Sequence, residues 1–511
     1  MNIIRKIEEI LFYFLLFAVP FQTRKILWQE NWYFNEWQTI SLYLTDLIFL
    51  VLFVFWILFY FSERGAKWKF LFTFCPSEAK RGEYSAALRR YQEAKPPLDT
   101  SRFAARRIYF RGGQIFNFHP PTGGSIFNKF SNFQISKFFQ SDFFLTIFLV
   151  VAAISIKNSS SPIVSFFQFL KLFEFILFYF YIKSYAFYRF SFSKTLLALF
   201  AGGIFQSVIA IGQFIKQSDL GLRILGESVL MPSLSGVASF FNSAGEKIIR
   251  AYGTTPHPNI LAAYLFLSIF AFYFLFLYKK DQNEESIIPW GLPLVFYFLM
   301  LFGLFFSFSR TVVFLWAAGF TAQAALIWLK KDFRTKFWRK SLVRRRLILI
   351  LIVTIAAMGI FATIYWPEVA SRSKLSSDDE AVQLRIFYGK ESLKSGLNLF
   401  GSGVGNFVNW FMKIDPNLPR YLYQPVHNIY LLIYSEIGIL GLASFVLFLI
   451  FLIKDFVKKT GMKELYHYSF LLFFLSVLII GFFDHFLFTI QQGRFIFWMI
   501  AALIASFQNR A

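Results

Sequence analysis

The stretch Gln424-Pro-Val-His-Asn-Ile-Tyr-Leu-Leu-Ile-Tyr-Ser-Glu-Ile-Gly438 marks the place where a long polar interval gives way to a long apolar one. Residues 366–426 form the longest polar interval in the second half of the chain, and the apolar run that follows is long enough to span a bilayer. His427 is therefore predicted to lie where a loop becomes a membrane helix. A titratable ring at this junction, facing a loop that carries Arg372 and Arg385, is a candidate for chemistry.

The composition of the whole chain is typical of a polytopic membrane protein. Of its 511 residues, 57% are hydrophobic and 22% are aromatic, with 74 Phe. Soluble domains have fewer aromatic residues. The first apolar run is not followed by a small-residue cleavage site, so we interpret it as a membrane span and not as a signal peptide. The single cysteine, Cys75, excludes an intramolecular disulfide and a cysteine-based metal site.

The apolar runs predict an all-α fold with about twelve transmembrane helices. The predicted spans are 8–21, 41–61, 142–157, 162–182, 194–215, 259–278, 287–308, 311–329, 346–365, 427–453, 467–487 and 491–508. The run 142–157 is short enough to be a re-entrant segment, and a Ser-rich turn joins it to 162–182. Either both of these runs cross the membrane or neither does, and the orientation of the other spans is the same in both cases.

Basic residues decide the predicted orientation. The chain has 52 Lys and Arg against 29 Asp and Glu, a net charge of +23. The basic residues gather in 63–140, in 330–346 and in 454–463. With twelve crossings these three segments share one side with both termini, and the positive-inside rule makes that side the cytoplasm. The charge is thus explained by topology, and nucleic-acid binding is not expected.

The chain is predicted to consist of an N-terminal pair of spans, a basic cytoplasmic insert, a central set of helices, a large exterior loop and a C-terminal set of helices. The boundaries of these five segments are 1–62, 63–140, 141–365, 366–426 and 427–511. The insert mixes basic, Pro, Gly and aromatic residues without periodicity, which favours a flexible extension. A patch for anionic lipid is the alternative.

The opposite, exterior side receives several loops. They are 22–40, 216–258, 309–310, 366–426 and 488–490. Two of them are far longer than most connections between helices, and long loops of this kind are usually functional or disordered. The amphipathic spacing of residues 381–397 predicts a short helix that lies over the membrane domain in the large loop between the ninth and tenth spans.

Three arginines on the predicted exterior side are candidate ligands of an anion: Arg250, Arg310 and Arg385. An Arg near a helix end can also reach lipid headgroups without a further role. Arg310 is less easily explained in this way, because the positive-inside rule disfavours an exterior cation in so tight a turn between two spans. A guanidinium matches phosphate oxygens bidentately, so several of them around one cavity would suit a diphosphate.

His427 has two interpretations, a capping or packing residue and a proton acceptor that works near neutral pH. His257 and His485 also lie on or near the predicted exterior side. In a regular helix Tyr434, seven positions on, shares the face of His427, whereas Glu436, nine positions on, is about half a turn out of phase. Glu436 is therefore expected to bond a neighbouring helix and not to orient His427.

Other chemistries have weaker signals. The turn at Ser402 is a poor match to a serine nucleophile between glycines. The acidic run 378–380 could bind a divalent cation, but a solvated loop is favoured. Lys171, Glu174 and Asp46 lie within predicted spans and would suit a transporter of polar or lipid-linked substrates, although Lys171 and Glu174 can pair with each other. No inverted repeat supports transport.

Four stretches together resemble the O-antigen ligase and polymerase superfamily of membrane glycosyltransferases. They are Arg250-Ala-Tyr-Gly-Thr-Thr-Pro-His-Pro-Asn259, Ser307-Phe-Ser-Arg-Thr311, Leu384-Arg-Ile-Phe-Tyr-Gly389 with Gly401-Ser-Gly-Val-Gly405, and His427-Asn-Ile-Tyr-Leu-Leu-Ile-Tyr-Ser-Glu-Ile-Gly438. The last is the most specific. The resemblance covers 200–511 well and 1–62 loosely, and the insert 63–140 departs from it.

The resemblance implies an integral-membrane glycosyltransferase fold in the cytoplasmic membrane, with an exterior active site and no metal or other cofactor. Its donor would be a glycan on undecaprenyl diphosphate, and its acceptor a hydroxyl of a lipid, a protein or another glycan. The residues to which it assigns a role are Arg310 and Arg385 (diphosphate), His427 (base or orienting group) and, as supporting residues, Arg250, His257, Asn428, Tyr434 and Glu436. A ligase is preferred, a polymerase is the alternative, and a membrane scaffold is a third interpretation.

Overall fold

The computed structural model describes residues 2–31, 34–64, 140–278, 291–339, 341–373, 380–394 and 398–507. The predicted flexible insert 63–140 lies almost wholly outside the described residues, as do residues 378–379 of the acidic run. One compact unit comprises Met1–Ile57 and Ile135–Ala511. The fold and the site both belong to this unit.

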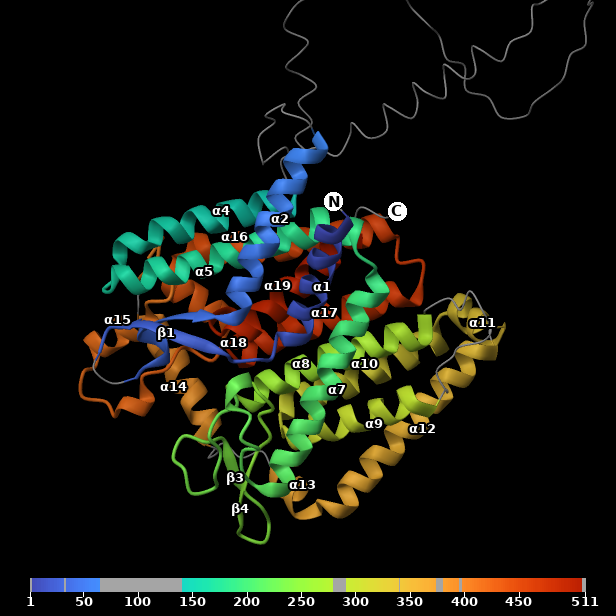
Figure 1. Ribbon diagram of the computed structural model, residues 1–511. Coiled ribbons are helices and arrows are strands. Elements are labelled where there is room, and N and C mark those ends of the chain that lie inside the picture. Colours follow the sequence, from blue (N-terminus) through green and yellow to red (C-terminus); the bar gives the residue numbers. More distant parts are fainter. Residues whose placement is uncertain are drawn as a thin grey trace, which may run out of the picture. The chain divides into compact units, whose positions relative to one another are not determined.

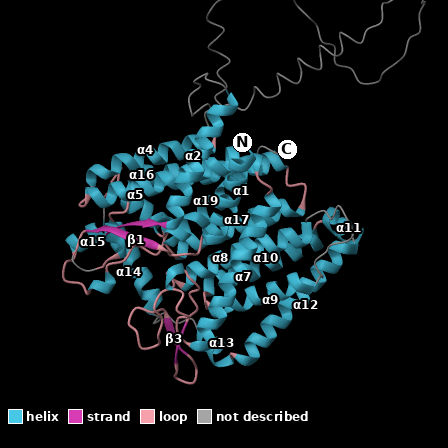
Figure 2. Ribbon diagram, in the orientation of Figure 1, coloured by secondary structure: helices cyan, strands magenta, loops and turns pink. Residues whose placement is uncertain are grey.

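Helices dominate the fold (Figures 1 and 2), and each predicted span falls on one of them. They are α1 (Asn2–Ala18), α2 (Leu44–Arg64), α4 (Ser141–Ser155), α5 (Pro162–Tyr181), α7 (Phe192–Lys216), α8 (Pro258–Tyr273), α9 (Gly291–Phe306), α10 (Arg310–Leu329), α12 (Ser341–Ile364), α16 (Ile429–Thr460), α17 (Leu465–Phe483) and α19 (Gln491–Ser506). Among the described residues, eight helices are long and apolar enough to cross a membrane. The chain is thus a mostly helical, multi-pass membrane protein, and the number of twelve crossings stays a prediction.

Helix α19 forms the centre of the helical core. All of its residues from Gln491 to Ser506 are buried. It contacts α5, α8, α16 and α17. On the other side of α8, helix α7 approaches closely because the facing residues are small: a Cβ added to Gly203 would lie 2.3 Å from the Cβ of Ser268. Small residues at such contacts are how membrane helices come close together.

Two short antiparallel hairpins add a little sheet to the mostly helical fold. Strands β1 (Arg24–Gln29) and β2 (Thr39–Tyr43) pair with each other, and so do β3 (Ser239–Phe241) and β4 (Lys247–Ile249). Both hairpins lie in or beside the predicted exterior loops 22–40 and 216–258, and Figure 2 shows them in magenta. Pairing satisfies backbone N–H and C=O groups that a long loop would otherwise leave to water.

The loops predicted to be exterior gather at one end of the unit. In Figure 1 the hairpins lie at the lower left with α13 (Trp366–Ser373), α14 (Glu380–Lys394) and α15 (Phe407–Ile414), whereas the termini and the basic helix α11 (Lys331–Arg339) lie toward the upper right. Helix α14 occupies the region where a short helix was predicted. Side-chain hydrogen bonds join the loops: Gln38 Nε2 donates to Asn409 Oδ1 (2.5 Å), and Asn242 Nδ2 donates to Glu368 Oε1 (3.2 Å).

Candidate active site

A chain of buried and half-buried polar side chains joins the loop before α8 to the end of α17. Arg250 Nη2 donates to Asn259 Oδ1 (2.6 Å), and Asn259 Nδ2 donates to Asp484 Oδ2 (2.7 Å). Arg250 Nε also donates to the carbonyl oxygen of Ser307, in the turn between α9 and α10 (2.7 Å). We call this group and the three imidazoles beside it the histidine–arginine cluster. Its members are Arg250, His257, Asn259, His427, Asp484 and His485.

His427 lies just before helix α16 and is held on several sides. Its ring stacks on Tyr388 of α14, with centroids 5.6 Å apart and planes inclined by 14°, and it meets the ring of His485 edge to face at 5.0 Å. Its Nδ1 is 3.2 Å from the carbonyl oxygen of Pro425. A carbonyl oxygen can only accept, so Nδ1 carries the proton. The lone pair of the neutral ring is therefore on Nε2, where it can accept a proton from a substrate.

His257 has the opposite tautomer. It is the N-cap of α8, and its Nδ1 accepts a hydrogen bond from the backbone N–H of Asn259 (3.2 Å). In the neutral ring the proton is therefore on Nε2. His257 can thus present an N–H donor to a ligand, whereas its accepting nitrogen is used to begin the helix. The structure separates two histidines that the sequence placed in similar positions.

Burial keeps the imidazoles of the cluster neutral. It lowers the pKa of His257 and of His485 to about 3, and it lowers the pKa of His427 as well. For Asp484, burial alone would raise the pKa, but the neighbouring histidines and the Asn259 amide outweigh it and hold the pKa at about 2. Near neutral pH the cluster therefore contains an ionised carboxylate and neutral imidazole rings.

The arginines meet in the same region. Burial, the charge of Arg372 and, more weakly, the charge of Arg310 lower the pKa of Arg250 to about 9. Arg385 donates from Nε to the carbonyl oxygen of Phe483 (3.2 Å), and its charge lowers the pKa of both His257 and His427. The positive charges of Arg372 and Arg310 thus repel that of the buried Arg250. A bound anion would relieve that repulsion.

Glu436 bonds the start of a neighbouring helix, α15 (Phe407–Ile414), through backbone groups of that helix and not through its side chains. Its carboxylate accepts from the backbone N–H groups of Gly405 (2.8 Å) and Phe407 (3.3 Å), just before and at the start of α15. The Gly-rich turn also packs closely against the backbone of α16. A Cβ on Gly401 would lie only 2.4 Å from the backbone of Glu436. At Gly438 the φ of 83° interrupts α16. Glu436 therefore anchors the large loop to α16.

The other supporting residues occupy different places. Asn428 is the N-cap of α16, and its Oδ1 accepts from the N–H groups of Tyr430 (2.9 Å) and Leu431 (3.0 Å). Tyr434 lies one turn further along α16 and is half-buried. The hydroxyl of Ser402 donates to the carbonyl oxygen of Ser435 (3.0 Å), an arrangement that ties down the Gly-rich turn.

The described residues form neither a candidate metal site nor a row of unpaired charges within the membrane helices. Within the described ranges, no group of three or more His, Cys, Asp or Glu side chains is arranged to hold a metal ion. The charges that favoured a transporter bond one another: Lys171 pairs with Asp46 and, at 3.2 Å, with Glu174.

Sequence reasoning missed two residues of the cluster, Asp484 and Asn259, as candidates for the site. Asp484 was placed inside a predicted span at 467–487, but α17 ends at Phe483 and Asp484 is its C-cap. A useful signal was present, because an acidic residue in the run Phe482-Phe483-Asp484-His485-Phe486 is rare in a membrane segment and marks a functional site by default. Asn259 stood within a quoted stretch, but its partner is 225 residues away.

Comparison with known proteins finds one family model that matches part of the chain. Residues 295–446 match the family model described as O-antigen ligase. The match includes Arg310, Arg385, His427 and Glu436, and it ends before Asp484. No curated protein matches the chain. The match confirms the resemblance drawn from the four sequence stretches, since residues 295–446 are similar to the O-antigen ligase family.

Proposed function

We propose that this protein transfers a glycan from undecaprenyl diphosphate to an acceptor hydroxyl on the exterior face of the cytoplasmic membrane. The observation that carries the proposal is the meeting of His427, with its accepting Nε2, and four arginines around the buried chain from Arg250 to Asp484. The family match supports a lipid-linked glycan as the substrate and a membrane as its setting.

The arginines are suited to the diphosphate of the donor. When the bond between sugar C1 and the phosphate oxygen breaks, the leaving diphosphate gains negative charge. Guanidinium groups already in position stabilise that charge more strongly in the transition state than in the bound donor, which accelerates the reaction. Arg310 and Arg385 are the proposed ligands, with Arg250 and Arg372 completing the positive field.

His427 is suited to activate the acceptor. As the acceptor oxygen forms its bond to C1, its proton passes to Nε2 of His427, and the pair of electrons from the broken C1–O bond leaves with the diphosphate. The resulting imidazolium is stabilised by the carboxylate of Asp484, whose charge favours the protonated ring. Tyr388 and the carbonyl of Pro425 keep the ring in one orientation.

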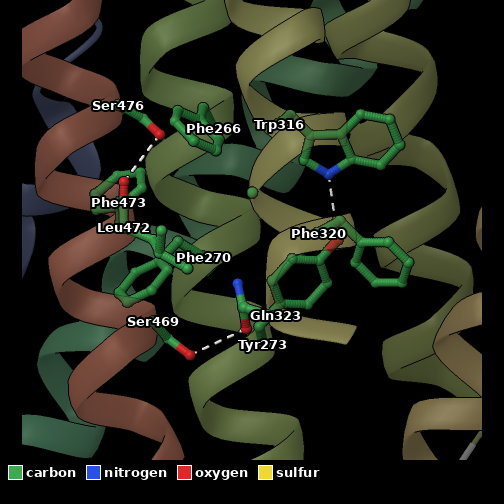
Figure 3. A pocket seen from close by; sticks show the side chains of 11 residues that line it. Phe266, Phe270, Tyr273, Trp316, Phe320, Gln323, Ser469, Leu472, Phe473 and Ser476 are labelled. Atoms are coloured by element: carbon green, nitrogen blue, oxygen red, sulfur yellow. Dashed lines mark hydrogen bonds between the residues drawn. The ribbon is translucent and has the colours of Figure 1, made fainter. Parts of the chain in front are cut away.

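A pocket between α8, α10 and α17 could hold the lipid tail of the donor (Figure 3). Aromatic rings line it, among them Phe266, Phe270, Trp316 and Phe320. Helix α10 begins at Arg310, so Trp316 lies about 9 Å further along the helix at 1.5 Å per residue. A polyprenyl chain whose diphosphate is held at Arg310 can therefore extend along α10 into this pocket.

The test is glycan transfer by the purified full chain in vesicles that contain an undecaprenyl-diphosphate-linked glycan. Mass spectrometry would measure both undecaprenyl diphosphate and the glycosidic product. His427→Ala and Arg310→Ala should abolish transfer at unchanged abundance, whereas the matched controls His467→Ala and Arg334→Ala, on other parts of the chain, should retain it. Full activity in both site variants would overturn the proposal.

A polymerase is the alternative with the same donor chemistry, because it differs in the acceptor alone. A deletion strain separates the two reactions. Loss of polymer length indicates a polymerase that extends the lipid-linked glycan. Intact polymer that remains on its lipid carrier indicates a ligase that joins the glycan to another surface molecule.

A further inference from the structure

A second polar region adjoins the histidine–arginine cluster on the side of His485 that carries Trp37. Two neighbouring cavities share four lining residues. These are Trp37, Gln168, Thr489 and Arg494, and we call the two cavities together the Arg494 cavity. None of these residues takes part in the donor chemistry described above.

Arg494 gives the cavity free hydrogen-bond donors. It lies on the buried helix α19, where Nε donates to the carbonyl oxygen of Phe488 (2.7 Å) and Nη2 donates to Gln168 Oε1 (2.6 Å). Within the described part of the chain, it forms no ion pair within 4.0 Å and Nη1 makes no hydrogen bond. A guanidinium has five N–H donors, so Arg494 retains donors at the wall of the cavity.

Trp37 provides an apolar wall. It lies in the short turn Glu36–Gln38 between β1 and β2, which is anchored on one side by the ion pair of Glu36 with Arg24 and on the other by the bond of Gln38 to Asn409. Its ring lines both cavities and meets the ring of His485 edge to face at 5.2 Å. A pre-positioned aromatic face beside a few convergent polar groups is the usual composition of a small-molecule site.

The charges around the cavity favour a neutral ligand. Glu436 lines the same cavity as Arg494, and Lys171 is already paired with Asp46 and Glu174. The wall therefore offers amide, hydroxyl, carboxylate and guanidinium groups together, which donate and accept in turn. A sugar ring has hydroxyls that do both and a C–H face that packs on an aromatic ring. A phosphate, which mainly accepts, fits the arginines beside the histidine–arginine cluster better.

The cavity also adjoins the candidate base. Pro425, whose carbonyl oxygen is 3.2 Å from His427 Nδ1, lines it, and so does Thr489, whose hydroxyl is 2.7 Å from His485 Nδ1. A sugar held against Trp37 would thus lie beside the imidazoles, while the arginines are reached through Asp484 and Asn259. We propose that the Arg494 cavity binds a sugar ring of the acceptor glycan and positions its hydroxyl for attack. This inference rests on the proposed function.

The test has two readouts on the purified full chain. Saturation-transfer NMR with methyl glycosides of glucose, galactose and N-acetylglucosamine measures sugar binding without the reaction. Kinetics with the lipid-linked donor measure the KM of the acceptor and of the donor separately. Trp37→Ala should abolish saturation transfer and raise the acceptor KM about tenfold or more, with the donor KM changed far less. Trp37→Phe should restore part of both.

A second variant and a control protect the test against misfolding. Gln168→Met keeps the shape of the side chain but removes the acceptor of Arg494, and it should raise the acceptor KM as well. Trp28→Ala, on the exposed face of the same hairpin, should leave both readouts unchanged. Unaltered sugar binding and acceptor KM in both Trp37→Ala and Gln168→Met would overturn the subsite while leaving the proposed function intact. Sugar binding that depends on Trp37 in a natural protein that transfers no glycan from the lipid-linked donor would instead overturn the proposed function and retain the sugar site.

Discussion

Two junctions of the same residue types lead into membrane helices, and the histidine has a different task in each. At the start of α16, Asn428 is the N-cap, and the ring of His427 is left outside the helix with its Nε2 open. At the start of α8, His257 is itself the N-cap, and the side chain of Asn259 is left to bridge Arg250 and Asp484. The side chain that caps the helix cannot also bind a ligand with the same atom. The neighbouring polar side chain is left to face the cluster.

The largest expected effect separates the two histidines. His427→Gln removes the proposed base and should lower kcat by about 10²–10⁴-fold, the usual contribution of a general base. His257→Gln removes a helix cap and an N–H donor, so its kcat should fall far less. Initial rates of glycan transfer at saturating donor and acceptor measure both, at matched protein abundance. Equal losses in the two variants would contradict the different roles assigned to the two junctions.

The next effect concerns the two asparagines. Asn259→Ala leaves Arg250 and Asp484 without a shared partner, and hydrogen bonds to charged groups are worth about 1.5–3 kcal/mol each. If donor binding loses half of the free energy of one such bond, the donor KM rises about threefold to tenfold. This follows because about 1.4 kcal/mol corresponds to a tenfold change in a binding constant. Asn428→Ala should leave the donor KM near that of the natural protein. Donor titrations at fixed acceptor concentration test this, and a larger rise in Asn428→Ala would reverse the assignment.

The helices were predictable from the sequence because long apolar runs specify them locally. The hairpins were not, because strands of three to six residues in polar loops depend on the pairing partner and not on their own composition. Helix ends also misled the prediction. The span 467–487 ran across Asp484, whereas the chain leaves the helix there and the carboxylate accepts from the backbone N–H of His485 (2.8 Å).

The site was predictable in part, for a similar reason. Arg310, Arg385 and His427 stand out locally as charged or titratable groups beside apolar runs. Asp484, Asn259 and Trp37 do not stand out in this way, because they reach the cluster from three other segments of the chain. Helical phase correctly separated Glu436 from His427, but it could not indicate that the partners of Glu436 are the N–H groups of Gly405 and Phe407.

A smaller effect is a shift of the pH profile. The pKa of His427 is lowered by burial, so kcat/KM should stay constant as pH falls through 6.5 and decline only at lower pH, when the base becomes protonated. The carboxylate of Asp484 raises this pKa and Arg385 lowers it. Asp484→Asn should therefore move the acid limb to lower pH, and Arg385→Gln should move it to higher pH. Shifts of the same sign in both variants would exclude His427 as the titrating group.

The smallest effect is on stability, and it sharpens the contrast between the two caps. Asn428→Ala removes an Oδ1 that accepts from two backbone N–H groups, and an N-cap of this kind is worth about 1 kcal/mol. Asn428→Asp retains an acceptor and should recover most of that loss. His257→Ala removes a single bond of 3.2 Å and should lower the Tm less. Thermal unfolding in one detergent ranks the three variants. A larger loss in His257→Ala than in Asn428→Ala would mean that His257 stabilises the cluster itself, in addition to beginning α8.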